Sequence, residues 1–521
     1  MLEAASAASI DRARTTWQAC RPFLDLASEN PRERILAYGI LTVAITVIAL
    51  WGSSFGGPLD VLAGWLPLLA VLWVTAPKIE VALARAIEER PISMLASVVS
   101  VWTVILVMQD PTASDDLLRH LAAWAFHYDY QSMFVYSTLP SPSLYPLFDH
   151  AAGFLAQHLG MVPAMHVVQL AALLSVIGPV IVLAHRRIGS GPARGTFLIV
   201  AVTLAICLSL GRIALGRPEV FLTGWVLAAM LPRGLPGIVA WLVAGLLLSA
   251  CHLLAPIYFI AVLLLPAPLR VRLAIGLALF AWHVAFWWIY SDGAVLAWLE
   301  LGAKALANRQ ADIEENMTIG MALFRWPFLL CAAGLAWLAH RRMLTTRSLL
   351  VLTVAAWFIV SGQIRYATTV GLLLLVALLD AFPPDTAVLA SRRWRLTLWT
   401  YAAVVLLSTP MRLPNYDSLP RFVLPDDARA LTGMGSNFSV IFHNAGKVRV
   451  APALELGATR ADVQRLAFGM DLKGRLDCEL VVRLGFTHVV EKSLVATDGP
   501  PPCLRLAQTQ GPWREWVVEP R

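Results

Sequence analysis

Long runs of apolar residues recur along the chain, separated by short polar stretches. The runs are continuous rather than alternating, which favours membrane-spanning helices over the strands of an outer-membrane barrel. Counted by length and composition, they predict about thirteen membrane segments. The segments lie at residues 35–52, 58–76, 93–109, 163–184, 196–211, 219–231, 237–249, 253–265, 273–290, 319–338, 348–361, 366–382 and 396–410.

Several predicted segments are shorter than the roughly twenty residues that usually cross a bilayer. The runs 237–249 and 253–265 can be one interrupted helix or two separate helices. The same two possibilities hold for 348–361 and 366–382. Short or interrupted helices are typical of membrane proteins in which a cavity enters the bilayer.

The composition also indicates an integral membrane protein. Of 521 residues, 58% are hydrophobic and only 14% are charged, whereas about a quarter of the residues in soluble domains are charged. No apolar run precedes residue 35, so residues 1–34 do not resemble a cleaved signal peptide. We expect them to form a cytoplasmic segment.

The net charge of +7 comes from Lys and Arg residues that gather in loops on one side of the predicted membrane. If the N-terminus is cytoplasmic, that side is the cytoplasmic one, as the positive-inside rule requires. Far fewer basic residues fall in the opposite loops: Arg119, Arg212, Arg217, Lys304, Arg309 and Arg365. The distribution therefore reports membrane topology and argues against a nucleic-acid surface.

This topology predicts an all-α polytopic membrane protein with a small extracytoplasmic domain. Residues 1–34 are cytoplasmic, residues 35–410 form the transmembrane domain, and residues 411–521 form the C-terminal domain. Two long loops, 110–162 and 291–318, lie on the same outer side as that domain. The second loop is predicted to contain an amphipathic helix at the membrane interface.

The C-terminal region differs in character from the membrane region. Helix-like residues occur near 452–470, and three short runs are strand-like: 438–442, 478–482 and 487–490. Together they predict an α/β or α+β domain. Cys478 and Cys503 both fall in this region and can form a disulfide, which would fit an oxidising compartment.

Two adjacent carboxylates, Asp115 and Asp116, begin an amphipathic stretch just past the outer end of the third predicted segment. Such carboxylates repel each other and resist desolvation. In one interpretation, one Asp caps the following helix and the other pairs with Arg119 or His120. In the other, one carboxylate is a general base for a hydroxyl or orients a sugar. An aromatic-rich stretch with Tyr128 follows in the same loop.

Basic residues also lie at outer turns between later segments. Arg212 and Arg217 fall between two apolar runs, close to Glu219. The arginine fork suits phosphate oxygens, but an ion pair between Arg217 and Glu219 would equally fix the turn. Arg365 either binds phosphate or extends to the membrane interface. His252 either joins the site or simply packs at its turn.

The predicted topology places all of these groups on one side of the membrane. Asp149 and Asp292 receive no role, and Asp312, Glu314 and Glu315 are interpreted as a solvated acidic face. An acid pair and a set of bases on one face predict a site at the membrane surface for a charged, hydroxyl-bearing substrate.

In these features the chain resembles the GT-C superfamily of integral-membrane glycosyltransferases. The resemblance rests on Asp115 and Asp116 at the head of an amphipathic helix in a large outer loop. It rests also on the turn Gly216-Arg217-Pro218-Glu219, on short paired helices and a second long outer loop, and on Arg365 before a late helix. The polar C-terminal domain completes it.

The resemblance implies a sugar donor linked to polyprenyl phosphate and a site on the periplasmic side of a bacterial inner membrane. Asp115 or Asp116 would deprotonate the acceptor hydroxyl, which attacks the anomeric carbon with inversion. Arg217 and Arg365 would stabilise the departing phosphate. Further donor-phosphate candidates are Arg212 and His252, and the acceptor- or sugar-binding candidates are Arg119, His120, Tyr128 and Glu219.

The implied partners are the lipid bilayer, the donor lipid, and an envelope glycan, lipid or protein as acceptor. No nucleic acid, cofactor or metal is expected, although the Asp pair leaves a divalent metal possible. Three other functions stay open: an envelope polysaccharide polymerase or ligase, a transporter or flippase, and a scaffold for envelope partners. A transporter would favour charges near the bilayer midplane and an internal repeat. The C-terminal domain is a candidate for acceptor recognition.

Overall fold

The computed structural model describes residues 91–108, 118, 120, 133–137, 144–188, 194–300, 326–360, 366–381, 419–433, 436–444, 447–452, 459–473, 476–492 and 501–519. They belong to two compact units. The described residues of the first unit are 91–102, 181–188 and 194–207, and all others belong to the second unit.

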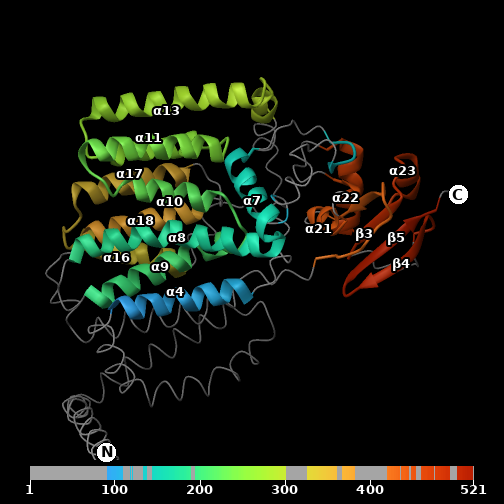
Figure 1. Cartoon of the computed structure of the whole chain (residues 1–521), viewed down its shortest axis with the longest axis horizontal. Coiled ribbons are helices and arrows are strands. Elements are labelled where there is room, and N and C mark those ends of the chain that lie inside the picture. Colours follow the sequence, from blue (N-terminus) through green and yellow to red (C-terminus); the bar gives the residue numbers. More distant parts are fainter. Residues whose placement is uncertain are drawn as a thin grey trace, which may run out of the picture. The chain divides into compact units, whose positions relative to one another are not determined.

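Figure 1 shows the described helices, most of which coincide with the apolar runs of the sequence. They are α4 (Pro91–Met108), α7 (Pro146–Leu159), α8 (Met161–Ile188), α9 (Arg194–Ala214), α10 (Glu219–Ala229), α11 (Gly234–Cys251), α12 (Pro256–Phe259), the 3-10 helix η2 (Ile260–Leu264), α13 (Leu269–Tyr290), α16 (Trp326–His340), α17 (Thr346–Val360) and α18 (Ala367–Ala381).

Several of these helices have the length and composition of membrane spans. Among the described residues, four are long and apolar enough to cross a bilayer: Met161–Arg187, Phe197–Ala214, Gly234–Cys251 and Leu269–Tyr290. Shorter apolar helices accompany them, including α10, α17 and α18. The predicted segments 35–52, 58–76 and 396–410 lie outside the described residues, so the total of about thirteen spans stays a prediction.

The runs 237–249 and 253–265 form separate helices, and so do the runs 348–361 and 366–382. After α11, His252 takes up an extended backbone conformation (φ −156°, ψ 136°), and α12 begins only at Pro256. Helices α17 and α18 pack against each other along their length. The second outer loop is helical at residues 295–300, and its remainder lies outside the described residues.

Helices that follow one another in the second unit pack as antiparallel neighbours, as α10 with α11 and α17 with α18, whereas α11 with α13 and α16 with α18 are parallel. Helix α10 packs against α11 and α18, α11 packs against α13, and α18 packs against α16 and α17 (Figure 1). Small residues allow close approach at two contacts. A Cβ on Gly224 of α10 would lie 2.6 Å from the backbone oxygen of Ser175, and one on Gly245 of α11 would lie 2.2 Å from Leu279.

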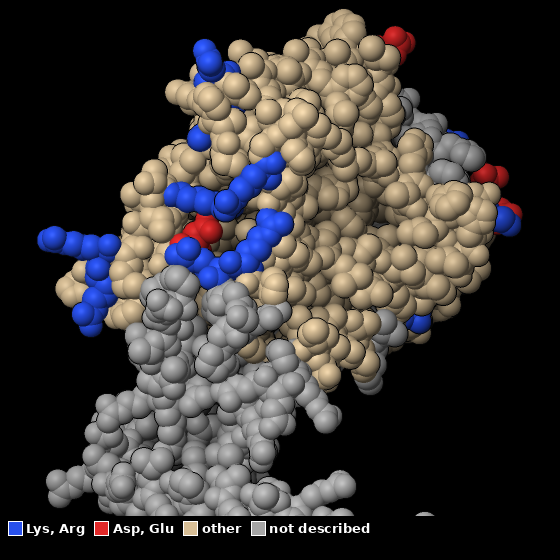
Figure 2. Space-filling model, turned by 60° about the vertical axis from the view of Figure 1, so that its left-hand side comes forward, with Lys and Arg blue, Asp and Glu red and all other residues tan. Residues whose placement is uncertain are grey.

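The two ends of these helices differ in charge. Because successive helices alternate in direction, one end, which we call the basic end, collects Arg233, Arg270, Arg272, Arg341, Arg342 and Arg347. Figure 2 shows Lys and Arg side chains gathered around an acidic side chain on one face. At the basic end Arg347 pairs with Asp380 of α18 at 3.1 Å. We call the opposite end, where α11 ends and α10 and α18 begin, the polar end.

The described part of the C-terminal region forms a mixed five-stranded sheet in the order β2-β1-β3-β5-β4. The strands are β1 (Arg429–Thr432), β2 (Arg449–Ala451), β3 (His488–Glu491), β4 (Leu504–Gln510) and β5 (Trp513–Val518). Strand β1 is parallel to β2 and β3, and β5 is antiparallel to β3 and β4. Helices α22 (Ala461–Lys473) and α23 (Cys478–Arg483) share a core with one face of the sheet. The predicted mixture of helices and strands is thus present.

Two of the three predicted strands in this region are wrong. The run 438–442 belongs to helix α21 (Asn437–His443), and the run 478–482 belongs to α23. A short apolar run has no period that separates a buried strand from a buried helix. The start of α23 is set instead by Asp477, whose side chain accepts a hydrogen bond from the Leu480 backbone N–H. The third run, 487–490, corresponds to β3.

A disulfide joins Cys478, at the start of α23, to Cys503, just before β4. We expect Cys478→Ser to lower the free energy of unfolding of the C-terminal domain by about 3 kcal/mol, because the bond restricts the unfolded chain. Thermal unfolding of the full chain with and without reductant measures this. Cys207→Ser, at a cysteine of α9 that forms no disulfide, is the control. If reductant leaves the unfolding temperature of the wild-type protein unchanged, the result would contradict the presence of the disulfide.

Candidate functional site

The turn between α9 and α10 brings two charged side chains to the polar end. Gly216, with φ +63°, takes the left-handed conformation that ends α9, and Pro218 starts α10. The Arg217 backbone N–H donates to the Arg212 carbonyl at 3.1 Å. Arg217 and Glu219 are buried, with 9% and 4% of their surface exposed, whereas Arg212 is half-buried.

A hydrogen-bonded polar layer lies one helical turn further along α10. Charged groups in an apolar bundle are tolerated where other polar groups surround them. Thr223 donates to the Glu219 carbonyl at 3.0 Å and shares a hydrogen bond of 2.8 Å with Thr369 of α18. Thr369 also lies 3.3 Å from the Tyr258 hydroxyl of α12. Helices α10, α12 and α18 therefore meet through polar contacts at the polar end.

His252 lies in the turn that follows α11 and is 2% exposed. Its Nδ1 accepts a hydrogen bond from the Leu254 backbone N–H at 2.9 Å. Because a backbone N–H can only donate, the neutral imidazole carries its proton on Nε2. The ring packs edge-on against Tyr145, with centroids 4.7 Å apart, and the Leu253 N–H donates to the Leu144 carbonyl. The turn after α11 is thereby held against the start of α7.

A buried histidine–carboxylate pair completes this region. Nδ1 of His120 lies 2.5 Å from Oδ1 of Asp149, and the two side chains are 3% and 0% exposed. The His120 ring also packs edge-on against Tyr145 and Phe148, with centroids 5.1 and 4.6 Å apart. Nδ1 faces the carboxylate, and in the neutral tautomer that donates from Nδ1 the other ring nitrogen, Nε2, accepts. Tyr145 contacts both His120 and His252, so the two histidines belong to one cluster.

The two buried carboxylates share this neighbourhood. Asp149 and Glu219 both lie close enough to the Cys251 thiol to interact with it electrostatically, and Glu219 acts in the same way on the Tyr258 hydroxyl. Residues from α7, α10 and the turn after α11 thus surround one polar centre. We call the following residues the polar cluster, in which Arg217 is included because it is buried and precedes Glu219 by two residues at the start of α10: His120, Asp149, Arg217, Glu219 and His252.

The structure brings together only part of the sequence-predicted site. His120, Arg217, Glu219 and His252 lie in the polar cluster, and Arg212 lies in the adjoining turn. The remaining predicted residues lie outside the described residues: Asp115, Asp116, Arg119, Tyr128 and Arg365. Tyr366, which directly follows Arg365, is buried and packs near Tyr258 with ring centroids 6.1 Å apart.

Sequence reasoning gives Asp149 no role, although the structure makes it the partner of His120. One signal could have identified it. Asp149 shares the buried face of α7 with Phe148, Ala152 and Ala156, and an acid on the apolar face of an amphipathic helix needs a partner. Tyr145, whose ring contacts both histidines, has no comparable signal in the sequence.

No group of three or more His, Cys, Asp or Glu side chains within the described ranges is placed to hold a metal ion. The cluster instead offers the Arg217 guanidinium, a hydrogen-bond donor from His252 Nε2 and the Nε2 atom of His120. Such a set can bind an anion and orient a hydroxyl. The expectation that no metal or cofactor is required stays a prediction.

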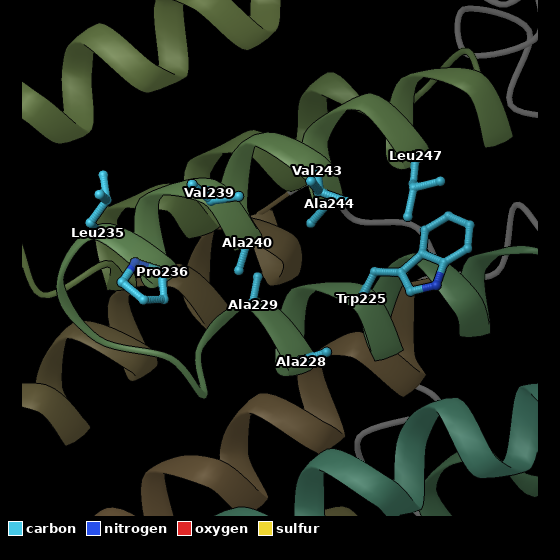
Figure 3. Close-up of a pocket in the computed structure, with 10 residues that line it drawn as sticks. All are labelled: Trp225, Ala228, Ala229, Leu235, Pro236, Val239, Ala240, Val243, Ala244 and Leu247. Carbon is cyan, nitrogen blue, oxygen red and sulfur yellow. The ribbon is translucent and has the colours of Figure 1, made fainter.

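An apolar groove with a volume of about 560 Å³ lies between α10 and α11 (Figure 3). Its walls are formed by Trp225, Ala228, Ala229, Leu235, Pro236, Val239, Ala240, Val243, Ala244 and Leu247. Trp225 follows Glu219 by less than two helical turns, and Leu247 precedes His252 by less than two turns. One end of the groove therefore approaches the polar cluster, and its lining suits a hydrocarbon chain.

No protein-family profile and no curated protein matches the sequence, but solved structures do resemble the fold. ArnT from Cupriavidus metallidurans bound to undecaprenyl phosphate aligns with a TM-score of 0.53 and 13% identity, over 82% of this chain and 99% of ArnT. Apo ArnT gives a TM-score of 0.50 and 12% identity over the same shares. The archaeal oligosaccharyltransferase AglB from Archaeoglobus fulgidus gives a TM-score of 0.46 and 11% identity, over 77% of this chain and 69% of that chain. This similarity is too low to support an inference. The chain therefore has the fold of ArnT.

Proposed function

We propose that the protein is a membrane glycosyltransferase that moves a sugar from a polyprenyl-phosphate donor to a hydroxyl of an envelope glycan, lipid or protein. The observation that carries this proposal is the polar cluster beside an apolar groove, in a chain with the fold of ArnT. A lipid-linked sugar phosphate has two parts that match this arrangement: an anionic head for the polar cluster and a hydrocarbon chain for the groove.

The donor would bind with its phosphate at the polar cluster and its polyprenyl chain along the α10–α11 groove. ArnT was crystallised with undecaprenyl phosphate, which supports a donor of this class. Arg217 and Arg365 would neutralise the phosphate charge that develops as the sugar leaves. His252, which carries its proton on Nε2, and Arg212 would add hydrogen bonds to the same oxygens.

The acceptor hydroxyl would approach from the side of the first outer loop. Asp115 or Asp116 would take its proton while the oxygen attacks the anomeric carbon, and the bond from that carbon to the phosphate oxygen breaks with inversion. His120, held by Asp149, would orient the acceptor. Further sugar contacts would come from Arg119, Tyr128 and Glu219.

We assign this chemistry to the periplasmic side of a bacterial inner membrane, with the N-terminus cytoplasmic and the C-terminal domain periplasmic. Two observations support this orientation. The arginines of the basic end lie at the helix ends opposite the polar cluster, as cytoplasmic loops require. The disulfide between Cys478 and Cys503 belongs in an oxidising compartment.

Removal of the general base is the first test. We expect Asp115→Asn or Asp116→Asn to lower kcat by about 10²–10⁴-fold, because one of them accepts the acceptor proton. Purified protein in nanodiscs, a panel of undecaprenyl-phosphate sugars and envelope acceptors, and release of undecaprenyl phosphate give the measurement. Asp426→Asn, in an exposed pair with Lys447, is the control. Full activity in both Asp variants would favour the polymerase or ligase alternative, and absence of lipid-phosphate release would favour a transporter.

Removal of a phosphate-binding cation is the second test. We expect Arg217→Gln to lower kcat by about 10²–10³-fold, because a fixed charge that stabilises the leaving group acts mainly in the transition state. The matched control is Arg233→Gln, at the exposed basic end. Equal effects of the two substitutions on kcat would argue against a phosphate site at Arg217.

Filling the groove is the third test. We expect Ala240→Trp to raise the KM for the donor roughly tenfold, since displacing two methylenes from an apolar site costs about 0.8 kcal/mol each. Leu277→Trp places the same side chain on the exposed face of α13 and serves as control. A donor KM that Ala240→Trp leaves unchanged would show that the polyprenyl chain lies elsewhere.

A further inference from the structure

A short piece of the first outer loop is joined to the edge of the C-terminal sheet. Phe134 forms a parallel bridge with Val450 of β2, and the Val135 N–H donates to the Val450 carbonyl at 2.8 Å. Strand β2 is an outer strand of the sheet. The piece therefore acts as one more short strand at that edge. We call residues 133–137 the strap.

The side chain of Tyr136 fastens the strap. Its ring lies under two guanidinium groups, with Cζ of Arg429 at 5.3 Å and Cζ of Arg460 at 4.2 Å from the ring centroid. Its hydroxyl donates to the Leu484 carbonyl at 2.7 Å and accepts from Arg429 Nη2 at 2.9 Å. Arg460 is itself bound by both oxygens of Asp462, and this contact holds the pKa of the Asp462 carboxyl below its usual range.

The strap is built into the domain rather than resting on its surface. Met133, Phe134 and Val135 are 0%, 3% and 7% exposed, and Val135 belongs to the core that α22 and α23 form with the sheet. Tyr136 has a backbone φ of +60°. Residues other than glycine rarely adopt this conformation, and here the surroundings must hold it. The contacts of the Tyr136 ring and hydroxyl supply that constraint.

The strap lies, along the chain, between the two members of the buried pair. The contact of His120 with Asp149 closes a loop of 29 residues, and the strap fixes the middle of that loop. Because the entropy of loop closure depends on the logarithm of loop length, halving the length of chain between fixed points favours closure about threefold. An anchored strap therefore stabilises the contact between His120 and Asp149 without touching either residue.

We propose that the C-terminal domain positions the polar cluster: by holding the strap through Tyr136, it keeps His120 against Asp149. Tyr136 is on this account a positioning residue, and the domain is part of the site rather than only a module for acceptor recognition. The catalytic consequence rests on the proposed function, but the structural coupling does not.

Amide hydrogen exchange of the full chain in nanodiscs tests the coupling. We expect Tyr136→Ala to speed exchange at least about threefold in peptides that contain His120 and in peptides from Tyr145 to Asp149. Peptides from α13 and β5 should exchange as in the wild type. The control is Lys492→Ala, which removes the contact of Lys492 with the Trp513 ring elsewhere in the same domain. Tyr136→Phe, which keeps the ring and its contacts with the two arginines, should give a smaller effect.

The proposal fails if exchange rises in the strap while the peptides around His120 and Asp149 keep wild-type rates. If Tyr136→Ala unfolds the sheet, seen as lost protection of β3 and β5, Tyr136→Phe and Arg460→Gln give the same comparison in a folded domain. Since no turnover is measured, the result is independent of whether the protein transfers sugar. In a transfer assay, Tyr136→Ala should lower kcat and leave the donor KM unchanged. A raised donor KM with unchanged kcat would contradict positioning of His120.

Discussion

A charged side chain inside an apolar helix bundle is tolerated only where other polar groups receive it, and this constraint organises the polar end. Arg217 and Glu219 are buried where α9 gives way to α10, next to the hydrogen-bonded threonines of α10 and α18. His120 and Asp149 satisfy each other in the same region. The described helices of the second unit thus bury Asp149, Arg217 and Glu219 at the polar end and carry their arginine-rich turns at the other.

The helices could be predicted because apolar runs of sufficient length have few alternatives in a membrane. The turn at Gly216 could also be predicted from the sequence, because glycine commonly ends a helix and proline commonly begins one. The strands of the C-terminal domain were not, because the runs 438–442 and 478–482 are too short to show a period. The partner of His120 lies 29 residues away, so it depends on how α7 folds back, which no local pattern encodes.

The proposed glycosyl transfer needs a place for an anion, a place for a hydrocarbon chain and a base for a hydroxyl. The polar cluster and the groove between α10 and α11 offer the first two within one compact unit. The base is assigned to the loop that also carries His120 and the strap. The C-terminal domain holds this loop through Tyr136, which would link a small folded domain to the proposed chemistry.

The most direct measurement is a cryo-electron microscopy structure of the full chain in nanodiscs that contain undecaprenyl phosphate. We expect phosphate density within hydrogen-bond distance of Arg217 and His252, with the polyprenyl chain running along Ala240 and Val243 in the α10–α11 groove. Phosphate density at the basic end, or a lipid phosphate at the polar end whose chain leaves the groove empty, would contradict it.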